Sequence, residues 1–332
     1  MTIMNTKRIL SIIFVTLITF TAATAQRISV VTEDGATSVY RTLQEAIEGA
    51  DSGSTIYLPG GGFTLPDSVK ITKRLTIIGI GHKSDNENAD GSTIISGNVF
   101  FNEGSSGSAL MSCYVTGDIN IGDEGAEVDD VTIKYCNLYR VMVKNSTCQE
   151  TVIDQNFIRN QSYFNGANAF FTNNIAFGIT NLDNGFVYNN IFTGTTYEKV
   201  DINWGTTSFH GVDNTIIKNN IFLSAALHYC RNCTTSNNMG INQNIGDDCI
   251  NLGEISWNDV FDNYNGGAIS PVSSFHFKGD YAQYEHEVGI YAGDGFNEDQ
   301  LAPVPFIISK SIPQQTDAAG KLNIKIRVKA GD

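Results

Sequence analysis

A group of aromatic, acidic and imidazole side chains between positions 163 and 210 has the composition of a sugar-binding surface. Its members are Tyr163, Tyr197, Asp201, Trp204 and His210. Pyranose rings pack against aromatic side chains, and polar groups beside those rings hydrogen-bond to the sugar hydroxyls. We therefore predict that these five residues bind a polysaccharide or another glycan. The alternative is that Tyr197 and Trp204 only cover a small core of their own segment.

Carboxylates and arginines elsewhere in the chain are residues that a polysaccharide-cleaving enzyme would use. Asp247 and Asp248 are adjacent, and inverting glycoside hydrolysis needs one carboxyl group as an acid and another as a base. Arg140 and Arg159 each follow a recurring asparagine by three residues, which makes them candidate bases of a lyase. These patterns assign no catalytic residue, and whether the chain is an enzyme stays open.

The acidic loop from Asp123 to Asp130 is the one segment where Ca²⁺ binding is an alternative to a solvated loop. It contains two glutamates and three aspartates, but their spacing differs from the alternating pattern of an EF-hand. Otherwise the sequence indicates no metal site and no cofactor.

Asparagine-containing segments recur through the middle of the chain. The recurring asparagines are Asn137, Asn156, Asn174, Asn190, Asn220, Asn238 and Asn258, with spacings of 19, 18, 16, 30, 18 and 20 residues. A repeat of this length is typical of one coil of a β-solenoid. The 30-residue spacing indicates one coil with an insertion of about a dozen residues, and insertions of this kind leave one face of a solenoid. This 30-residue segment contains Tyr197, Asp201, Trp204 and His210.

The residue type at the repeated position has a physical explanation. A coil must turn sharply between short strands, and asparagine tolerates the left-handed backbone conformation better than other non-glycine residues. Asparagine side chains at equivalent corners also hydrogen-bond to one another along the stack. We expect the apolar residues three positions before and one position after each asparagine to point into the core.

The two ends of the chain carry different patterns that suggest closure of the solenoid. Thr42–Ala50 is a short amphipathic helix that would cover the first coil. Leu322–Lys329 alternates apolar and polar residues, which predicts a half-buried closing strand; a secretion-sorting domain is the alternative. The fold predicted is all-β: a single-stranded right-handed parallel β-helix over residues 26–270, followed by a closing segment over 271–332 packed on the solenoid.

The N-terminal residues have the pattern of a cleaved signal peptide over residues 1–25. Lys7 and Arg8 precede the apolar run Ile9–Phe20, and Ala23-Thr24-Ala25 is a cleavage site. The protein is therefore expected to be secreted, periplasmic or at the cell surface, with no membrane span. Removal of Lys7 and Arg8 changes the net charge from −14 to −16, which argues against nucleic acid and bare membrane as partners.

Six cysteines occur in this chain. Cys230-Arg-Asn-Cys233 has the CxxC spacing, but a redox role would need a thioredoxin-like βαβ unit and zinc would need a second pair. Cys230 and Cys249 are 19 residues apart, so a disulfide between neighbouring coils is one prediction. Separate buried thiols are the alternative.

Two stretches of sequence, one near each end of the mature chain, resemble known β-helix proteins. The entry region, from the Thr42 helix through Ser52–Leu58, resembles that of pectin-lyase-like proteins, and the tail from Val288 resembles the end of uncharacterised exported bacterial right-handed β-helix repeat proteins. The resemblance to that bacterial group covers essentially the mature chain. These resemblances imply the fold rather than an activity, because that bacterial group lacks an established reaction.

The stretch Gly246-Asp-Asp-Cys-Ile250 resembles a motif of polygalacturonase-type glycoside hydrolases. This resemblance implies that Asp247 and Asp248 are the carboxylates of such a site. The Asn-Thr-Asp, Gly-His-Gly and Arg-Ile-Lys motifs of that family are missing here, which puts the implied activity in doubt.

These observations lead to one preferred function and two alternatives. We expect an exported, glycan-associated β-helix that binds a polysaccharide along one flank without cleaving it. A polysaccharide lyase or glycoside hydrolase is the first alternative, and a structural or adhesive surface solenoid is the second. The fold itself does not choose among them, since β-helices serve all three roles.

Overall fold

A computed structural model describes most of the chain. The described residues are 27–67, 69–83, 91–194, 209–224, 230–242, 245–262, 264, 269–270, 273–293, 295–313, 315–316 and 319–329. The expected signal peptide therefore lies outside the described residues. Within the ranges described, no helix is long and apolar enough to cross a bilayer.

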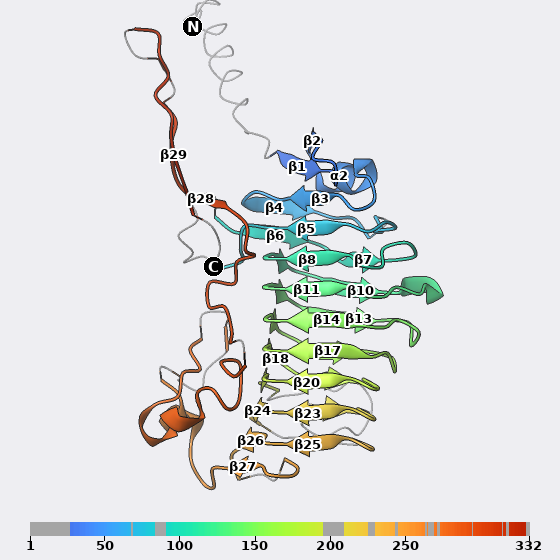
Figure 1. Cartoon of the computed structure of the whole chain (residues 1–332), viewed down its shortest axis with the longest axis vertical. Helices are drawn as coiled ribbons and strands as arrows, with labels where there is room; N and C mark the ends of the chain where they lie inside the picture. Colours follow the sequence, from blue (N-terminus) through green and yellow to red (C-terminus); the bar gives the residue numbers. More distant parts are fainter. Residues whose placement is uncertain are drawn as a thin grey trace, which may run out of the picture.

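Short parallel strands stack into three sheets that enclose a common core (Figure 1). Sheet A contains β1 (Ile28–Val31), β2 (Thr37–Tyr40), β3 (Thr55–Tyr57), β5 (Thr76–Ile78), β8 (Ala109–Met111), β11 (Thr132–Lys134), β14 (Thr151–Asp154), β17 (Ala169–Thr172), β20 (Phe186–Tyr188), β23 (Ile216–Lys218) and β25 (Thr234–Ser236). Sheet B contains β4 (Gly61–Thr64), β6 (Thr93–Ser96), β9 (Tyr114–Val115), β12 (Asn137–Leu138), β15 (Phe157–Ile158), β18 (Ile175–Ala176), β21 (Ile191–Phe192), β24 (Ile221–Phe222), β26 (Met239–Gly240) and β27 (Ile250–Asn251). Sheet C contains β7 (Val99–Phe101), β10 (Asp118–Ile121), β13 (Arg140–Val143), β16 (Ser162–Tyr163), β19 (Ile179–Thr180) and β22 (Phe209–His210).

From β5 to β22, each coil passes through one strand of sheet A, one of sheet B and one of sheet C before it returns to sheet A. The run β14, β15, β16 and β17 shows this order, and β14 pairs in parallel with β17. Successive coils therefore lie one strand spacing apart, about 4.8 Å. The predicted all-β parallel solenoid is confirmed.

A helix and two antiparallel strand pairings lie at the N-terminal end of the stack. Helix α2 (Leu43–Gly49) follows Thr42, whose hydroxyl accepts from the amide of Glu45 while the Glu45 carboxylate accepts from the amide of Thr42. This capping box fixes the start of the helix. Leu43, Ala46 and Ile47 are buried, and β1 pairs in antiparallel fashion with both β2 and β3.

The corner between sheets A and B contains one left-handed residue followed by one buried polar residue. The left-handed residues are Ser112, Tyr135, Gln155, Asn173, Asn189, Asn219, Asn237 and Asp248. The expectation that the recurring asparagine itself is left-handed is wrong by one position. In the Asn-Asn pairs the first asparagine takes the positive φ and the second, fully buried, points inside the corner.

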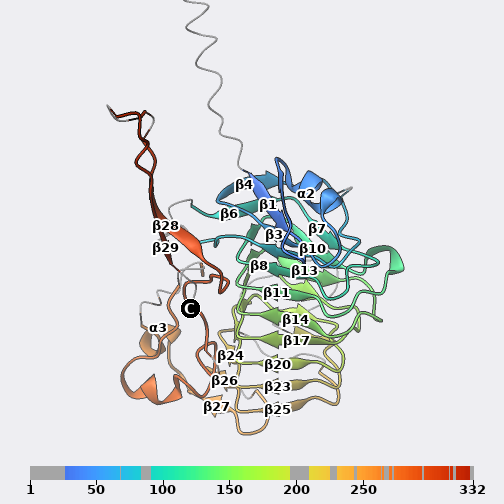
Figure 2. The same ribbon diagram turned by 45° about the horizontal axis from the view of Figure 1, so that its top comes forward.

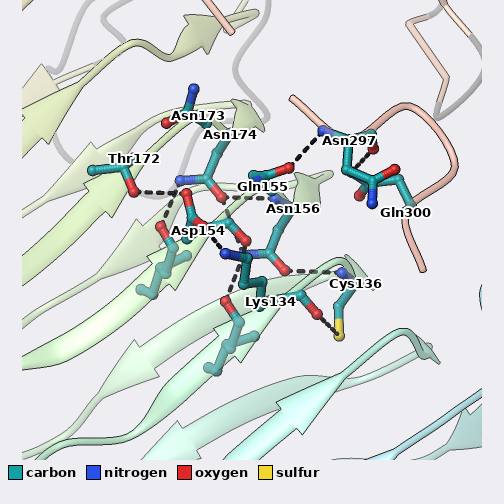
Figure 3. Close-up of polar contacts among 12 residues, drawn as sticks. Lys134, Cys136, Asp154, Gln155, Asn156, Thr172, Asn173, Asn174, Asn297 and Gln300 are labelled. Carbon is teal, nitrogen blue, oxygen red and sulfur yellow. Dashed lines mark hydrogen bonds and ion pairs between the residues drawn. The ribbon is translucent and has the colours of Figure 1, made fainter. Parts of the chain in front are cut away.

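The buried asparagines form a continuous hydrogen-bonded ladder (Figure 3). The Oδ1 atom of Asn174 accepts from the backbone amide and side-chain amide of Asn156 at 2.9 and 3.1 Å. Asn190 does the same for Asn174, at 2.8 and 3.1 Å. Each Nδ2 also donates to a carbonyl of the preceding coil, as Asn174 does to Ile153 at 2.8 Å. The predicted stacking of asparagine amides is confirmed.

Cysteines occupy the ladder position in other coils. The amide of Cys136 donates to Asn156 Oδ1 at 2.9 Å, and the Cys136 thiol donates to the carbonyl of Lys134 at 3.2 Å. Asn137, expected in the ladder, lies one residue later and pairs with Phe157. Cys249 precedes Ile250 just as Asn238 precedes Met239, its partner in sheet B. Small polar side chains other than asparagine therefore serve at this corner.

The apolar residue directly after each ladder position points away from the solenoid core, contrary to expectation. The second residue after it, such as Ile158 or Phe192, points inward instead. The outward residues are Phe157, Ile175, Ile191, Ile221 and Met239, and they are buried in a separate cluster with Trp257, Val260, Phe261, Phe275, Phe277, Val288 and Ile290. This second core attaches the C-terminal segment, with α3 (Trp257–Val260) and η2 (Gly279–Tyr284), to sheet B.

Residues 287–293 and 295–302 form a strap that runs back along the A–B corner toward the N-terminal coils. Its carbonyls and amides bind the left-handed corner residues in reverse order of the coils. Asn237 Nδ2 donates to the Glu287 carbonyl at 3.4 Å. Gln155 Oε1 accepts from the Asn297 amide at 2.5 Å (Figure 3). Between them, Asn173 donates to the carbonyls of Ile290 and Ala292. Both polar residues of the corner therefore have partners. The buried ladder residue hydrogen-bonds along the stack, and the left-handed residue before it hydrogen-bonds to the strap.

The final strands differ from the expectation of a half-buried strand. β28 (Phe306–Ser311) and β29 (Lys325–Lys329) pair with each other alone, in an antiparallel hairpin that projects from the body (Figures 1 and 2). Ile326 and Val328 are 52% and 58% exposed. The alternating pattern predicts the strand correctly, but among the described residues no second layer covers its apolar face.

His276 lies between two carboxylates on the strap side of the C-terminal segment. Its Nδ1 contacts Glu285 Oε1, its Nε2 lies 2.8 Å from Glu298 Oε1, and its ring stacks on Tyr291 with centroids 4.1 Å apart. Tyr291 donates to the same Glu298 oxygen at 2.7 Å, and Lys83 contacts the Glu298 carbonyl.

These contacts shift the pKa of both charged partners. Burial alone would lower the pKa of His276, but the hydrogen bonds and charges of Glu285 and Glu298 raise it above its ordinary value. Burial would likewise raise the pKa of Glu298, but the hydrogen bonds from Tyr291 and His276 lower it. The cluster therefore favours a protonated imidazole bridging two carboxylates.

We predict that Asn190→Ala lowers the free energy of unfolding by about 3 kcal/mol or more, because it leaves the buried amide groups of Asn174 without an acceptor. Denaturant unfolding followed by circular dichroism measures the change. Asn323→Ala, on the exposed hairpin, is the matched control and should change stability by about 0.5 kcal/mol or less. Equal stability of Asn190→Ala and the wild type would show that the ladder contributes nothing.

We predict that strap attachment weakens at alkaline pH. Because the pKa of folded His276 lies above its unfolded value of about 6.5, its contribution is complete below that value and is lost as the pH rises through the raised pKa. The contribution of Glu298, whose pKa is lowered, is instead lost as the pH falls through that lowered value.

Hydrogen exchange of amides 287–302 across about pH 5 to about pH 9, corrected for intrinsic rates, measures this attachment. His276→Gln should abolish the alkaline loss of protection. His286→Gln, which changes an exposed histidine of the same segment, should retain it. Identical profiles for wild type and His276→Gln would contradict the assignment.

Candidate functional site

Two of the five residues predicted to bind glycan have backbones in line on sheet C. Tyr163 of β16 pairs with Thr180 of β19, which pairs in turn with His210 of β22. The Tyr163 side chain is partly exposed, and its hydroxyl donates to Asn165 Oδ1 at 3.3 Å. The structure thus brings Tyr163 and His210 to the same register position two coils apart.

The other three predicted binding residues, Tyr197, Asp201 and Trp204, lie outside the described residues. The insertion that carries them begins after β21 and ends before β22. Their participation in a site with Tyr163 and His210 stays a prediction.

The paired carboxylates Asp247 and Asp248 are explained by the corner between sheets A and B. Asp248 takes the left-handed conformation, with φ of 49°, and Asp247 aligns with Ser236 at the end of β25. The Gly246-Asp-Asp-Cys-Ile250 stretch is therefore one more copy of the corner that elsewhere reads Ser-Asn-Asn-Met. Both carboxylates are exposed.

Arg140 and Arg159 both serve structural contacts between coils. Arg140 forms a two-pronged ion pair with Asp118, at 2.8 and 3.0 Å. Arg159 donates to the carbonyls of Leu138 and Val115 at 3.1 Å each and stacks over Tyr114. Because their donors are engaged in this way, neither guanidinium is placed as the base of a lyase.

The acidic loop that was considered for Ca²⁺ already has a cation beside it. Lys70 Nζ lies 3.1 Å from Asp123 and 2.8 Å from Glu124. The hydrogen bonds to Glu124 and Asp123 raise the pKa of Lys70 against the opposing effect of burial. The described residues contain no group of three or more histidine, cysteine or acidic side chains suited to a metal ion.

A row of apolar and aromatic side chains lies on the outer face of sheet A. Parallel pairing aligns Val152, Phe170, Phe186 and Ile216 in four successive coils. The rings of Phe170 and Phe186 are parallel, within 3°, with centroids 5.1 Å apart, and Phe170 is 39% exposed. Tyr188 packs edge-on against Phe186 at 5.9 Å. We call Phe170, Phe186 and Tyr188 the aromatic platform.

A polar row runs parallel to this apolar row, two residues further along each strand. It contains Lys134, Asp154, Thr172, Tyr188, Lys218 and Ser236. Lys134 Nζ lies 2.7 Å from Asp154, and Thr172 donates to the other carboxylate oxygen at 2.8 Å (Figure 3). Lys218 is exposed. The two rows together place rings beside hydroxyl, ammonium and carboxylate groups.

This face could do binding chemistry of the kind expected for a glycan. Parallel sheets are usually covered on both faces, so an exposed Phe170 stacked on a partly exposed Phe186 in the next coil is unusual. The sequence alone does not predict the platform, because Phe170 and Phe186 also fit the repeating pattern. The available signal was the alternation Phe-Phe-Thr and Phe-Val-Tyr, in which the first and third residues face the side opposite to the buried Phe171 and Val187.

Comparison of this chain with protein-family models, curated proteins and solved structures finds no match. The parallel β-solenoid therefore stands on the coordinates and the repeat alone. Membership of the pectin-lyase-like superfamily stays a prediction from resemblance.

Proposed function

We propose that this protein binds a polysaccharide on the outer face of sheet A and does not cleave it. The observation that carries the proposal is the aromatic platform, Phe170, Phe186 and Tyr188, flanked by the polar row. The apolar faces of pyranose rings pack against the phenyl groups, while Thr172 and the Lys134–Asp154 pair hydrogen-bond to hydroxyls.

The spacing of the solenoid supports a polymeric ligand. Equivalent side chains recur every coil, at about 4.8 Å, and the sugar units of an extended glycan recur along their chain at a similar interval. Each sugar unit would then contact one coil, and these contacts would extend from the coil of Val152 to the coil of Ile216. A repeating ligand gains several weak contacts at once, so no single deep pocket is needed.

The arrangement of carboxylates supports binding rather than cleavage. Hydrolysis needs two carboxyl groups on opposite sides of the scissile bond. Among the described residues of the polar row, Asp154 is the one carboxylate beside the platform, and it is already paired with Lys134 and Thr172.

The predicted signal peptide supports a location outside the cytoplasm. An exported protein meets polysaccharides of the cell envelope or the surroundings. Export, like glycan binding, is a proposal, and it is tested by N-terminal sequencing of the protein recovered outside the cytoplasm, which should begin at Gln26.

A glycan array probed with the whole mature chain, followed by titration of any glycan retained, tests the proposal. We predict that Phe170→Ala weakens binding about tenfold, which corresponds to about 1.4 kcal/mol, because it removes the most exposed ring of the platform. Tyr57→Ala is the matched control, since Tyr57 is also 39% exposed on sheet A, and it should bind like the wild type.

The same titration with Tyr163→Ala locates the glycan. Unchanged binding by this variant would place the glycan on sheet A, whereas a loss confined to it would favour the flank predicted from the sequence. Wild-type affinity of Phe170→Ala, or retention of no glycan, would refute the proposal. Release of new reducing ends or unsaturated sugars would favour the enzyme alternative.

A further inference from the structure

Cys230 and Cys233 flank a corner at the start of the last strand of sheet A. Between them Asn232 takes the left-handed conformation, with φ of 56°, and reverses the chain before β25. Both cysteines are partly exposed and pack against the same end of the main core. The corner therefore brings together two thiols that are three residues apart in sequence.

The contacts of Cys233 place its sulfur beneath this corner. In the thiol form it donates to the carbonyl of Val212 at 3.3 Å and lies 3.6 Å from the carbonyl of Arg231. Its side chain is also hydrogen-bonded to that of Cys230, and this contact lowers the pKa of Cys233 to about 7, against the opposing effect of burial. A substantial fraction of Cys233 is then thiolate at neutral pH, which is the nucleophilic form.

An open hollow of about 490 Å³ lies at the same corner, lined by Asp213, Asn214, Arg231 and Asn232. Arg231 and Asn232 are the two residues between the cysteines. The hollow is thus lined by the turn that joins the two cysteines, and the cysteines themselves are not among its lining residues.

The other cysteines are placed differently. Cys113, Cys136 and Cys148 are fully buried, and burial raises the pKa of each, to about 12 for Cys136. Cys249 aligns with Asn238, which follows β25, whereas Cys230 precedes β25. The two cysteines therefore lie at opposite ends of this strand. A three-residue strand spans about 10 Å, which exceeds the reach of a disulfide. The disulfide predicted between Cys230 and Cys249 is therefore not formed.

We propose that Cys230 and Cys233 are a redox-active pair that closes to an intrachain disulfide by exchange with a low-molecular-weight disulfide of the glutathione class. The Cys233 thiolate attacks one sulfur of that disulfide, forms a mixed disulfide and releases one thiolate. The Cys230 thiolate then attacks the Cys233 sulfur and releases the second. Two cysteine thiols are oxidised, one small disulfide is reduced to two thiols, and the two cysteine protons pass to the released thiolates.

Incubation of the whole chain with oxidised glutathione, acid quenching and alkylation of the denatured protein tests the pairing. Of six cysteines, four should be alkylated, and one peptide should contain Cys230 joined to Cys233. Cys249→Ser is the matched control and should form the same disulfide. Alkylation of all six cysteines, or a disulfide that includes Cys249, would overturn the proposal.

The order of attack is tested separately. In Cys230→Ala the exchange should stop at a glutathione adduct on Cys233. The rate of iodoacetamide modification of native Cys233 should have a midpoint near pH 7 in the wild type and move toward about 8.5 in Cys230→Ala. Two results would show that Cys233 is not the attacking thiol. One is a midpoint that does not move in Cys230→Ala. The other is a glutathione adduct on Cys230 in Cys233→Ala together with no adduct on Cys233 in Cys230→Ala.

Discussion

The structure depends on the satisfaction of buried polar groups at the corner between sheets A and B. A coil that turns there leaves backbone amides inside the protein, and each such amide would be costly without an acceptor. Asn156, Asn174, Asn190, Asn220 and Asn238 meet this need for one another, since the Oδ1 of each accepts from the amide of the coil before it. The ladder fixes the register of successive coils, because a shift by one residue would break every one of these bonds.

A fixed register decides what the outer faces can do. Residues four before the ladder position, such as Phe170 and Phe186, come into one line on sheet A, and residues two before it form the polar row. On sheet B the residues just after the ladder position form an apolar stripe, but Trp257, Phe261 and Phe275 cover it. The outer faces of sheets A and B therefore both carry apolar rows. The row on sheet B is covered by the C-terminal segment and is not available to a ligand.

The sequence predicts the coil and its period well, because both rest on local physics. Recurring Asn at 16–20 residues and the buried residue three before it, such as Ile153 or Phe171, agree with the structure. The one-residue error in the left-handed position arose because Asn-Asn pairs offer two candidates, and either asparagine tolerates positive φ. In other coils the left-handed residue is Gln155 or Tyr135, and Cys136 takes the ladder position after Tyr135. These coils show which of the two positions is left-handed, but only once the strand pairing is known.

The features that the sequence did not predict depend on contacts between distant segments. The apolar residue directly after each ladder position faces outward because the C-terminal segment covers it. Residues of that segment, about 100 positions further along the chain, contact Ile175 and Ile191. Motifs interpreted alone also left out the turns that hold them: Asp247 and Asp248, and the cysteine pair around Asn232, all occupy corners. Asp248 is explained by its corner, since a left-handed residue is all that the turn requires. Cys230 and Cys233 retain an unexplained property, because the turn needs Asn232 but does not need two adjoining thiols.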